Sequence, residues 1–73
     1  MRSTTKRAIK EAVETARKLR VNDKTNEAYF LLYETIYYWF DCLGINPTKD
    51  KKLNEQSKRE LIIEATEKAR GML

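Results

Sequence analysis

The chain has 73 residues, of which 36% are charged and 41% hydrophobic, and a formal net charge of +4. This composition is typical of one small globular helical domain and excludes a disordered chain. A single cysteine, Cys42, and the lack of histidine exclude an intrachain disulfide and a structural zinc site.

The first predicted helix covers about residues 4–20, with Ser3 or Thr4 as its N-cap. Its apolar residues recur at spacings of three and four, which predicts one buried face. These residues are Ala8, Ile9, Ala12, Val13, Ala16 and Leu19. Lys6, Lys10 and Arg17 share another face, which we interpret as solvated.

The second predicted helix covers about residues 24–43 and follows a turn at Asn22 and Asp23. Asp23 or Thr25 can cap its first turn through a side-chain oxygen. Gly44 is expected to end it, because glycine readily adopts the left-handed conformation that closes a helix.

This second helix is apolar over nearly its whole circumference, whereas a surface helix needs only one apolar stripe. Its predicted core face comprises Ala28, Leu32, Ile36, Trp39 and Leu43. We expect Trp39 to be largely buried, against Ile9 or Val13 on one side and Leu61 or Ala65 on the other. The opposite side carries a narrow acidic stripe of Glu27, Glu34 and Asp41, flanked by Phe30 and Tyr37 and by Leu31, Tyr38 and Cys42.

The third predicted helix is secure over residues 54–70, and two starts are open. Pro47 suits a first helical position, whereas Ser57 and Glu60 have the spacing of a capping box. Its inward face comprises Leu61, Ile62, Ala65, Ala69 and Met72, and Ile63 points away from it. Residues 1–73 are therefore predicted to form a single all-α domain, an antiparallel three-helix bundle.

No set of residues completes a catalytic, metal or cofactor motif. Without histidine the commonest general base is missing, and Cys42 has no predicted base beside it, so we interpret it as a buried or half-buried side chain. Glu27, Glu34 and Asp41 lie seven residues apart, about 10.5 Å along a helix, which is too far to share one ion. We predict no enzyme activity and no cofactor.

Charge is spread unevenly, with a balance of +5 over residues 1–20, −3 over residues 21–43 and +2 over residues 44–73. We favour the interpretation that oppositely charged helices lie side by side. The alternative is a basic surface for nucleic acid. Its predicted contacts are Lys6, Lys10, Arg17, Lys49, Lys51 and Lys52.

Residues 25–44, with Ala28-Tyr29-Phe30 early and Tyr33-Glu34 after it, resemble the central helix of HEPN-like helical domains, small bundles of archaea and bacteria. Ser57 to Leu61 lies where that family often has a polar helix start. The resemblance implies nucleotide or RNA binding, and some members are ribonucleases with an R-x(4–6)-H motif. Because the chain has no histidine, the resemblance implies a non-catalytic member. Tyr38-Trp39-Phe40-Asp41 is also similar to the Trp-[Leu/Phe]-Asp element of a small archaeal helical family.

The apolar excess on the second helix predicts self-association. Two neighbouring helices can cover about two thirds of its circumference. Phe30 and Tyr37, or Leu31 and Tyr38, would then face water, and a twofold homodimer is the commonest way to cover such a patch. Another protein partner is the alternative. The chain lacks a long apolar leader, and its longest apolar-rich run is too short and too charged to span a bilayer, so we expect a cytoplasmic protein with no membrane partner.

Overall fold

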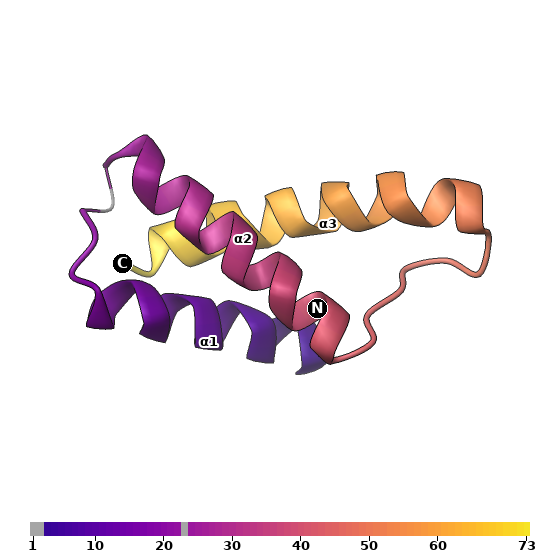
Figure 1. Cartoon of the computed structure of the whole chain (residues 1–73), viewed down its shortest axis with the longest axis horizontal. Coiled ribbons are helices and arrows are strands. Elements are labelled where there is room, and N and C mark those ends of the chain that lie inside the picture. Colours follow the sequence, from indigo (N-terminus) through magenta and orange to yellow (C-terminus); the bar gives the residue numbers. More distant parts are fainter. Residues whose placement is uncertain (1–2, 23) are drawn as a thin grey trace.

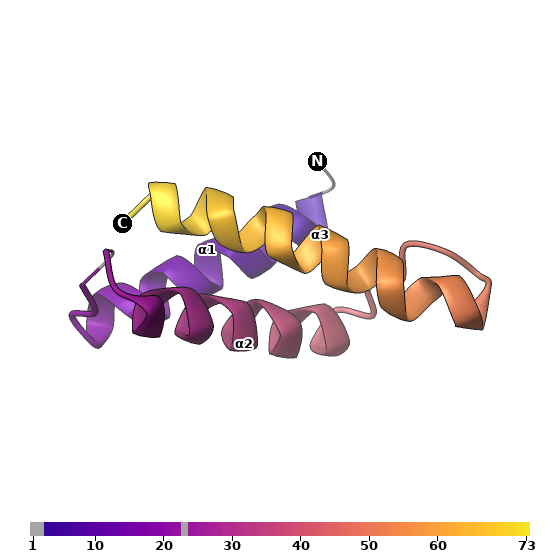
Figure 2. The same cartoon turned by 90° about the horizontal axis from the view of Figure 1, so that it is seen from above.

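The computed structural model describes residues 3–22 and 24–73 and contains three helices: α1 (Ser3–Lys18), α2 (Asn26–Cys42) and α3 (Lys51–Gly71). The chain runs along α1, returns along α2 and turns again into α3, and every pair of helices is in contact. Figures 1 and 2 show α2 crossing over both other helices. The predicted all-α antiparallel three-helix bundle is confirmed.

Both ends of α2 follow from side-chain and backbone chemistry. The Thr25 hydroxyl accepts a hydrogen bond from the Ala28 N–H (3.2 Å), which confirms one of the two predicted caps. The other, Asp23, lies outside the described residues. Gly44 has a φ of 65°, and the Ile45 N–H donates to the Phe40 carbonyl (2.9 Å), so the predicted glycine stop is confirmed.

The end of α1 uses the same backbone arrangement without a glycine. Arg20 has a φ of 53°, and the Val21 N–H donates to the Ala16 carbonyl at 3.2 Å. Helix α1 ends at Lys18 rather than near residue 20, and Ser3 and Thr4 lie in its first turn rather than before it. A side chain in the left-handed region is strained, because its Cβ approaches the following carbonyl oxygen.

The predicted starts of α3 were both wrong. Asp50 is the N-cap, and its carboxylate accepts hydrogen bonds from the Lys52 N–H (2.9 Å) and the Leu53 N–H (3.4 Å). The helix therefore begins between Pro47 and Ser57 and runs to Gly71. Aspartate is among the preferred N-cap residues, so the sequence contained this signal.

The core lies where the three helices cross and confirms most of the predicted faces. Its buried hydrophobic residues are Ala8, Ile9, Ala12, Val13, Ala16, Ala28, Leu32, Ile36, Phe40, Ile45, Ile62, Ala65 and Ala69. Leu19 and Met72, which we expected inside, are exposed, because each stands where its helix has already ended or is ending. Ile63 is exposed, as predicted.

Trp39 packs against the core, as predicted, but it is only partly buried and is not the enclosed aromatic of the bundle. It lies at the edge of the core, and the Arg7 guanidinium carbon lies 5.8 Å from the centroid of its ring system. Phe40 is fully buried instead. Phe40 continues the row of every fourth residue that begins at Ala28 and passes through Leu32 and Ile36, and this row faces the other two helices.

Across residues 3–22 and 24–73, no helix combines the length and the apolar character that crossing a bilayer requires.

Candidate interaction surfaces

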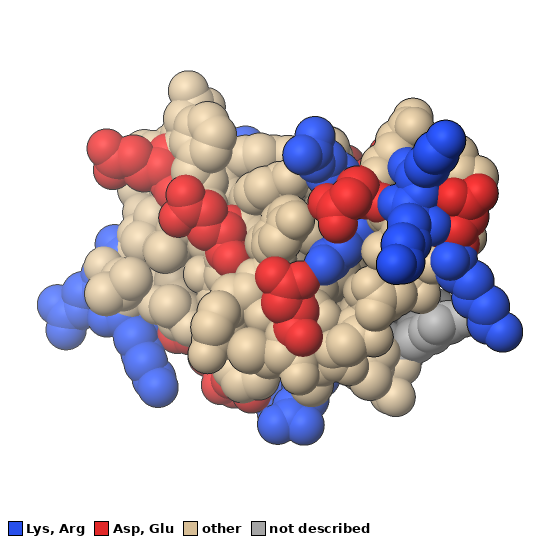
Figure 3. All heavy atoms as spheres, turned by 45° about the vertical axis from the view of Figure 1, so that its right-hand side comes forward, with Lys and Arg blue, Asp and Glu red and all other residues tan. Residues whose placement is uncertain are grey.

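The outer face of α2 is defined by its exposed side chains, which are Asn26, Glu27, Phe30, Glu34, Tyr38, Asp41 and Cys42. Phe30 is 62% exposed and Tyr38 is 63% exposed. On a helix these two rings lie on either side of the row formed by Glu27, Glu34 and Asp41. Figure 3 shows acidic side chains in a diagonal row over α2 with uncharged surface beside it.

Only half of the predicted interface residues lie on this outer face. Leu31 and Tyr37 are half-buried and pack against the core, whereas Phe30 and Tyr38 point to solvent. We expected either Phe30 and Tyr37 or Leu31 and Tyr38 to face water, and each of these two pairs is covered in part. One residue of each pair is exposed, and both α1 and α3 contact α2.

Lys58 of α3 joins one acid of the stripe to the bundle. Its side chain is only 8% exposed, and its Nζ donates a hydrogen bond to the Asp41 carboxylate. The same Nζ lies 5.0 Å from the centroid of the Tyr37 ring. The hydrogen bond to Asp41 raises the pKa of Lys58 above its ordinary value, although burial of the side chain acts in the opposite direction.

Glu27 and Glu34 are the other two acids of the stripe. They form no ion pair with the part of the chain that the structure describes. Both side chains are exposed, so their negative charge is directed to solvent. The prediction of an acidic stripe opposite the core face of α2 is confirmed, and its pairing with a basic helix is realised at Asp41.

Cys42 is exposed, not buried or half-buried as we predicted, because it lies on the outer side of the last turn of α2. It lies one helical turn after Tyr38. A side-chain hydrogen bond with Cys42, together with the electrostatic interaction between the two groups, raises the pKa of Tyr38.

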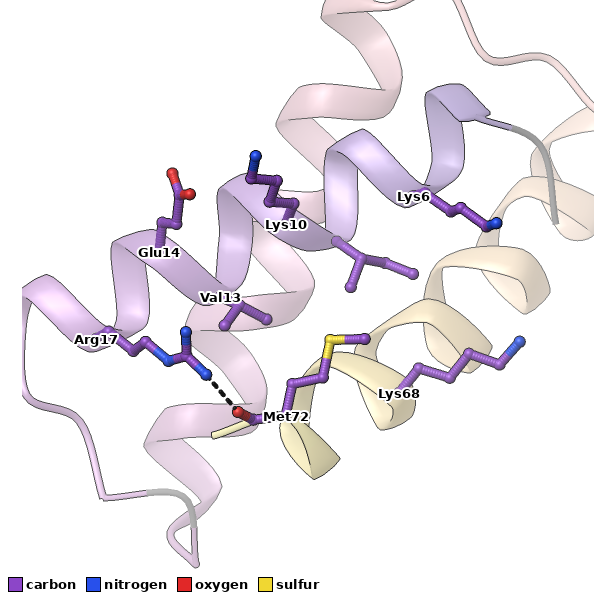
Figure 4. Close-up of a pocket in the computed structure, with 8 residues that line it drawn as sticks. Lys6, Lys10, Val13, Glu14, Arg17, Lys68 and Met72 are labelled. Carbon is purple, nitrogen blue, oxygen red and sulfur yellow. Dashed lines mark hydrogen bonds between the residues drawn. The ribbon is translucent and has the colours of Figure 1, made fainter.

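A basic groove separates α1 from the C-terminal half of α3, with a volume of about 680 Å³. Its lining residues are Lys6, Ile9, Lys10, Val13, Glu14, Arg17, Lys68 and Met72. Figure 4 shows Val13 and Met72 facing each other between the helices, with Lys10 and Glu14 pointing outward along α1. Arg17 closes one end by donating a hydrogen bond to the Met72 carbonyl at 2.8 Å.

The groove collects only one of the two basic clusters that we predicted for nucleic acid. Lys6, Lys10 and Arg17 all line it, and α3 adds Lys68, which sequence reasoning did not include. The second cluster, Lys49, Lys51 and Lys52, is exposed at the N-terminal end of α3 and does not line the groove. The two clusters therefore do not form one continuous basic surface.

No protein-family model matches the chain, and no curated protein or solved structure matches it significantly. The resemblance to HEPN-like domains stays a prediction. Within residues 3–22 and 24–73, no three side chains of the cysteine, aspartate or glutamate type gather as metal ligands.

Proposed function

We propose that this chain is a non-catalytic interaction module that associates with copies of itself through the outer face of α2. The homodimer expected from the sequence is the smallest such assembly. The observation that carries the proposal is the exposure of Phe30 and Tyr38, at 62% and 63%, on the same side of one helix. Aromatic side chains of this size are typical anchors of protein interfaces, because they contribute large contact area at a low entropy cost.

The size of the domain supports the same proposal. Thirteen buried hydrophobic residues make up its core, and six of them are alanines, which contribute little buried area each. Small domains often complete their stability by covering apolar surface with a second chain. A partner on the outer face of α2 would remove Phe30 and Tyr38 from water without any change in the fold.

Light scattering tests this proposal. The wild-type chain should exceed the monomer mass at about 100 μM, well above the dissociation constants of ordinary specific complexes. A Phe30→Ser, Tyr38→Ser variant, hereafter the face variant, should be monomeric while keeping its helical circular dichroism. A Leu53→Ser, Ile63→Ser variant is the matched control, because it removes two exposed apolar side chains elsewhere (55% and 40% exposed) and should associate normally.

A wild type that is monomeric at this concentration would contradict the proposal, as would a face variant that associates like the wild type.

A nucleic-acid-binding accessory domain is the second candidate, supported by the four basic side chains of the groove. It would use Lys6, Lys10 and Arg17, with Lys49, Lys51 and Lys52 as a separate contact. Its weakness is the acidic Glu14 in the same groove and the acidic outer face of α2. Binding of a short RNA or DNA that falls steeply with salt would favour it.

A further inference from the structure

We propose that the outer face of α2 docks in the basic groove between α1 and α3 of a second copy, so that copies join head to tail. This inference rests on the proposed self-association and names the surface that receives α2. The α2 face of one copy and the groove of the next copy would then form one interface, and this interface would be repeated along the assembly.

Charge argues against the simpler contact of α2 with its own counterpart. Helix α2 carries Glu27, Glu34 and Asp41 and has no lysine or arginine. A twofold contact through this face would place the acidic stripe of one copy against that of the other, and Glu34 lies at its middle. Facing like charges oppose association, and this cost falls on the face that carries the exposed aromatic rings.

The groove has the opposite charge and an apolar floor. Lys6, Lys10 and Arg17 line it from α1 and Lys68 from α3, against one acid, Glu14. Ile9 and Val13 form its floor at 3% and 5% exposure, and Met72 lies beside them at 54% exposure. A volume of about 680 Å³ leaves room for an aromatic side chain above this floor.

The spacing of charges on the two surfaces also agrees. Glu27 and Glu34 lie seven residues apart, as do Lys10 and Arg17, and both intervals correspond to about 10.5 Å along a helix. A helix laid along the groove can therefore place two acids beside two cations of α1. With the acids on that rim, a ring that flanks them, Phe30 or Tyr38, is placed over the apolar floor.

The position of the two surfaces determines the form of the assembly. Figure 4 looks into the groove from the side opposite α2, whose ribbon lies behind it. Because face and groove lie on opposite sides of one copy, a single pairing leaves one groove and one face open. Such a heterologous contact generates a ring if the rotation closes and a chain if it does not.

The experiment adds a groove variant, Lys6→Glu with Lys10→Glu, to the face variant. Both lysines are exposed and form no ion pair with the described residues, so the fold should persist, as circular dichroism will check. Each variant alone should lose association at about 100 μM. An equimolar mixture should form a 1:1 heterodimer and nothing larger, because one intact groove meets one intact face. Raising the salt from about 0.05 M to about 0.5 M should weaken wild-type assembly.

Three outcomes would overturn the inference. A groove variant that associates like the wild type would assign self-association to α2 against α2, with the proposed function intact. Two monomeric variants that do not combine on mixing would show that face and groove are not partners. If the wild type binds a short RNA or DNA, and the groove variant associates normally but no longer binds it, the groove would be assigned to nucleic acid. A monomeric wild type would instead refute the proposed function itself.

Discussion

Phe40 and Trp39 are adjacent in the chain but should differ sharply in what they contribute to stability. Phe40 is fully buried, and replacing a buried phenylalanine by alanine costs about 3–5 kcal/mol. Trp39 is only partly buried at the edge of the core, so water can fill the space that its truncation leaves and no cavity cost is added. The expected cost is therefore lower, about 2–3 kcal/mol. The free energy of unfolding of so small a domain is itself only about 4–11 kcal/mol.

Thermal unfolding followed by far-ultraviolet circular dichroism measures this difference. Trp39→Ala should keep a cooperative transition, with its midpoint lowered by about 8–24 °C. Phe40→Ala should melt at a temperature well below that of Trp39→Ala, or be largely unfolded already at room temperature. Phe40→Leu is the milder variant that keeps the comparison measurable, at a cost of about 1–1.5 kcal/mol. A Trp39→Ala protein less stable than Phe40→Ala would refute the assignment of Phe40 as the buried aromatic.

Two further predictions concern a helix end and an ion pair. Arg20→Gly should raise the free energy of unfolding by about 0.5–1 kcal/mol, because the left-handed conformation at that position strains any side chain. Arg20→Ala, which keeps the Cβ, should bring no such gain in a urea titration. Asp41→Asn should lower stability by about 1 kcal/mol at neutral pH, because the hydrogen bond to Asp41 raises the pKa of Lys58 in the folded state. The contribution of this pair to the free energy of unfolding is fully present below the pKa of lysine in the unfolded chain, and it is lost as the pH rises through the raised pKa of Lys58 in the folded chain. The stabilities of wild type and variant should therefore converge in alkaline solution. A constant difference would contradict the role of this pair.

Local sequence signals predicted the elements of this fold well. The apolar spacing of three and four located all three helices, and Thr25 and Gly44 marked the ends of α2 because their roles depend on the nearest turn alone. Asp50 was missed for a different reason. Pro47 and Ser57 both offer recognised start signals, and the sequence alone does not rank them against a single aspartate.

Features that depend on how the helices cross were harder to predict from the sequence. Trp39 and Phe40 both belong to the broad apolar side of α2, and only the positions of α1 and α3 decide which ring is enclosed. The groove shows the same limit. Lys6, Lys10 and Arg17 could be grouped by periodicity, but Lys68 joins them only through the packing of α3 against α1.

The uneven distribution of charge along the chain becomes an uneven distribution in space. Opposite charges on neighbouring helices can neutralise one another. Lys58 of α3 and Asp41 of α2 form such an ion pair. The ion pair of Lys68 lies within α3, to Glu64 at 3.4 Å, and leaves Lys68 on the groove. Glu27 and Glu34 point outward on one side while the basic groove opens on the other, so the fold keeps its charges apart. Charges arranged in this way add little to the stability of one copy, because exposed groups are well solvated. In the proposed head-to-tail contact they would instead favour one alignment of the copies.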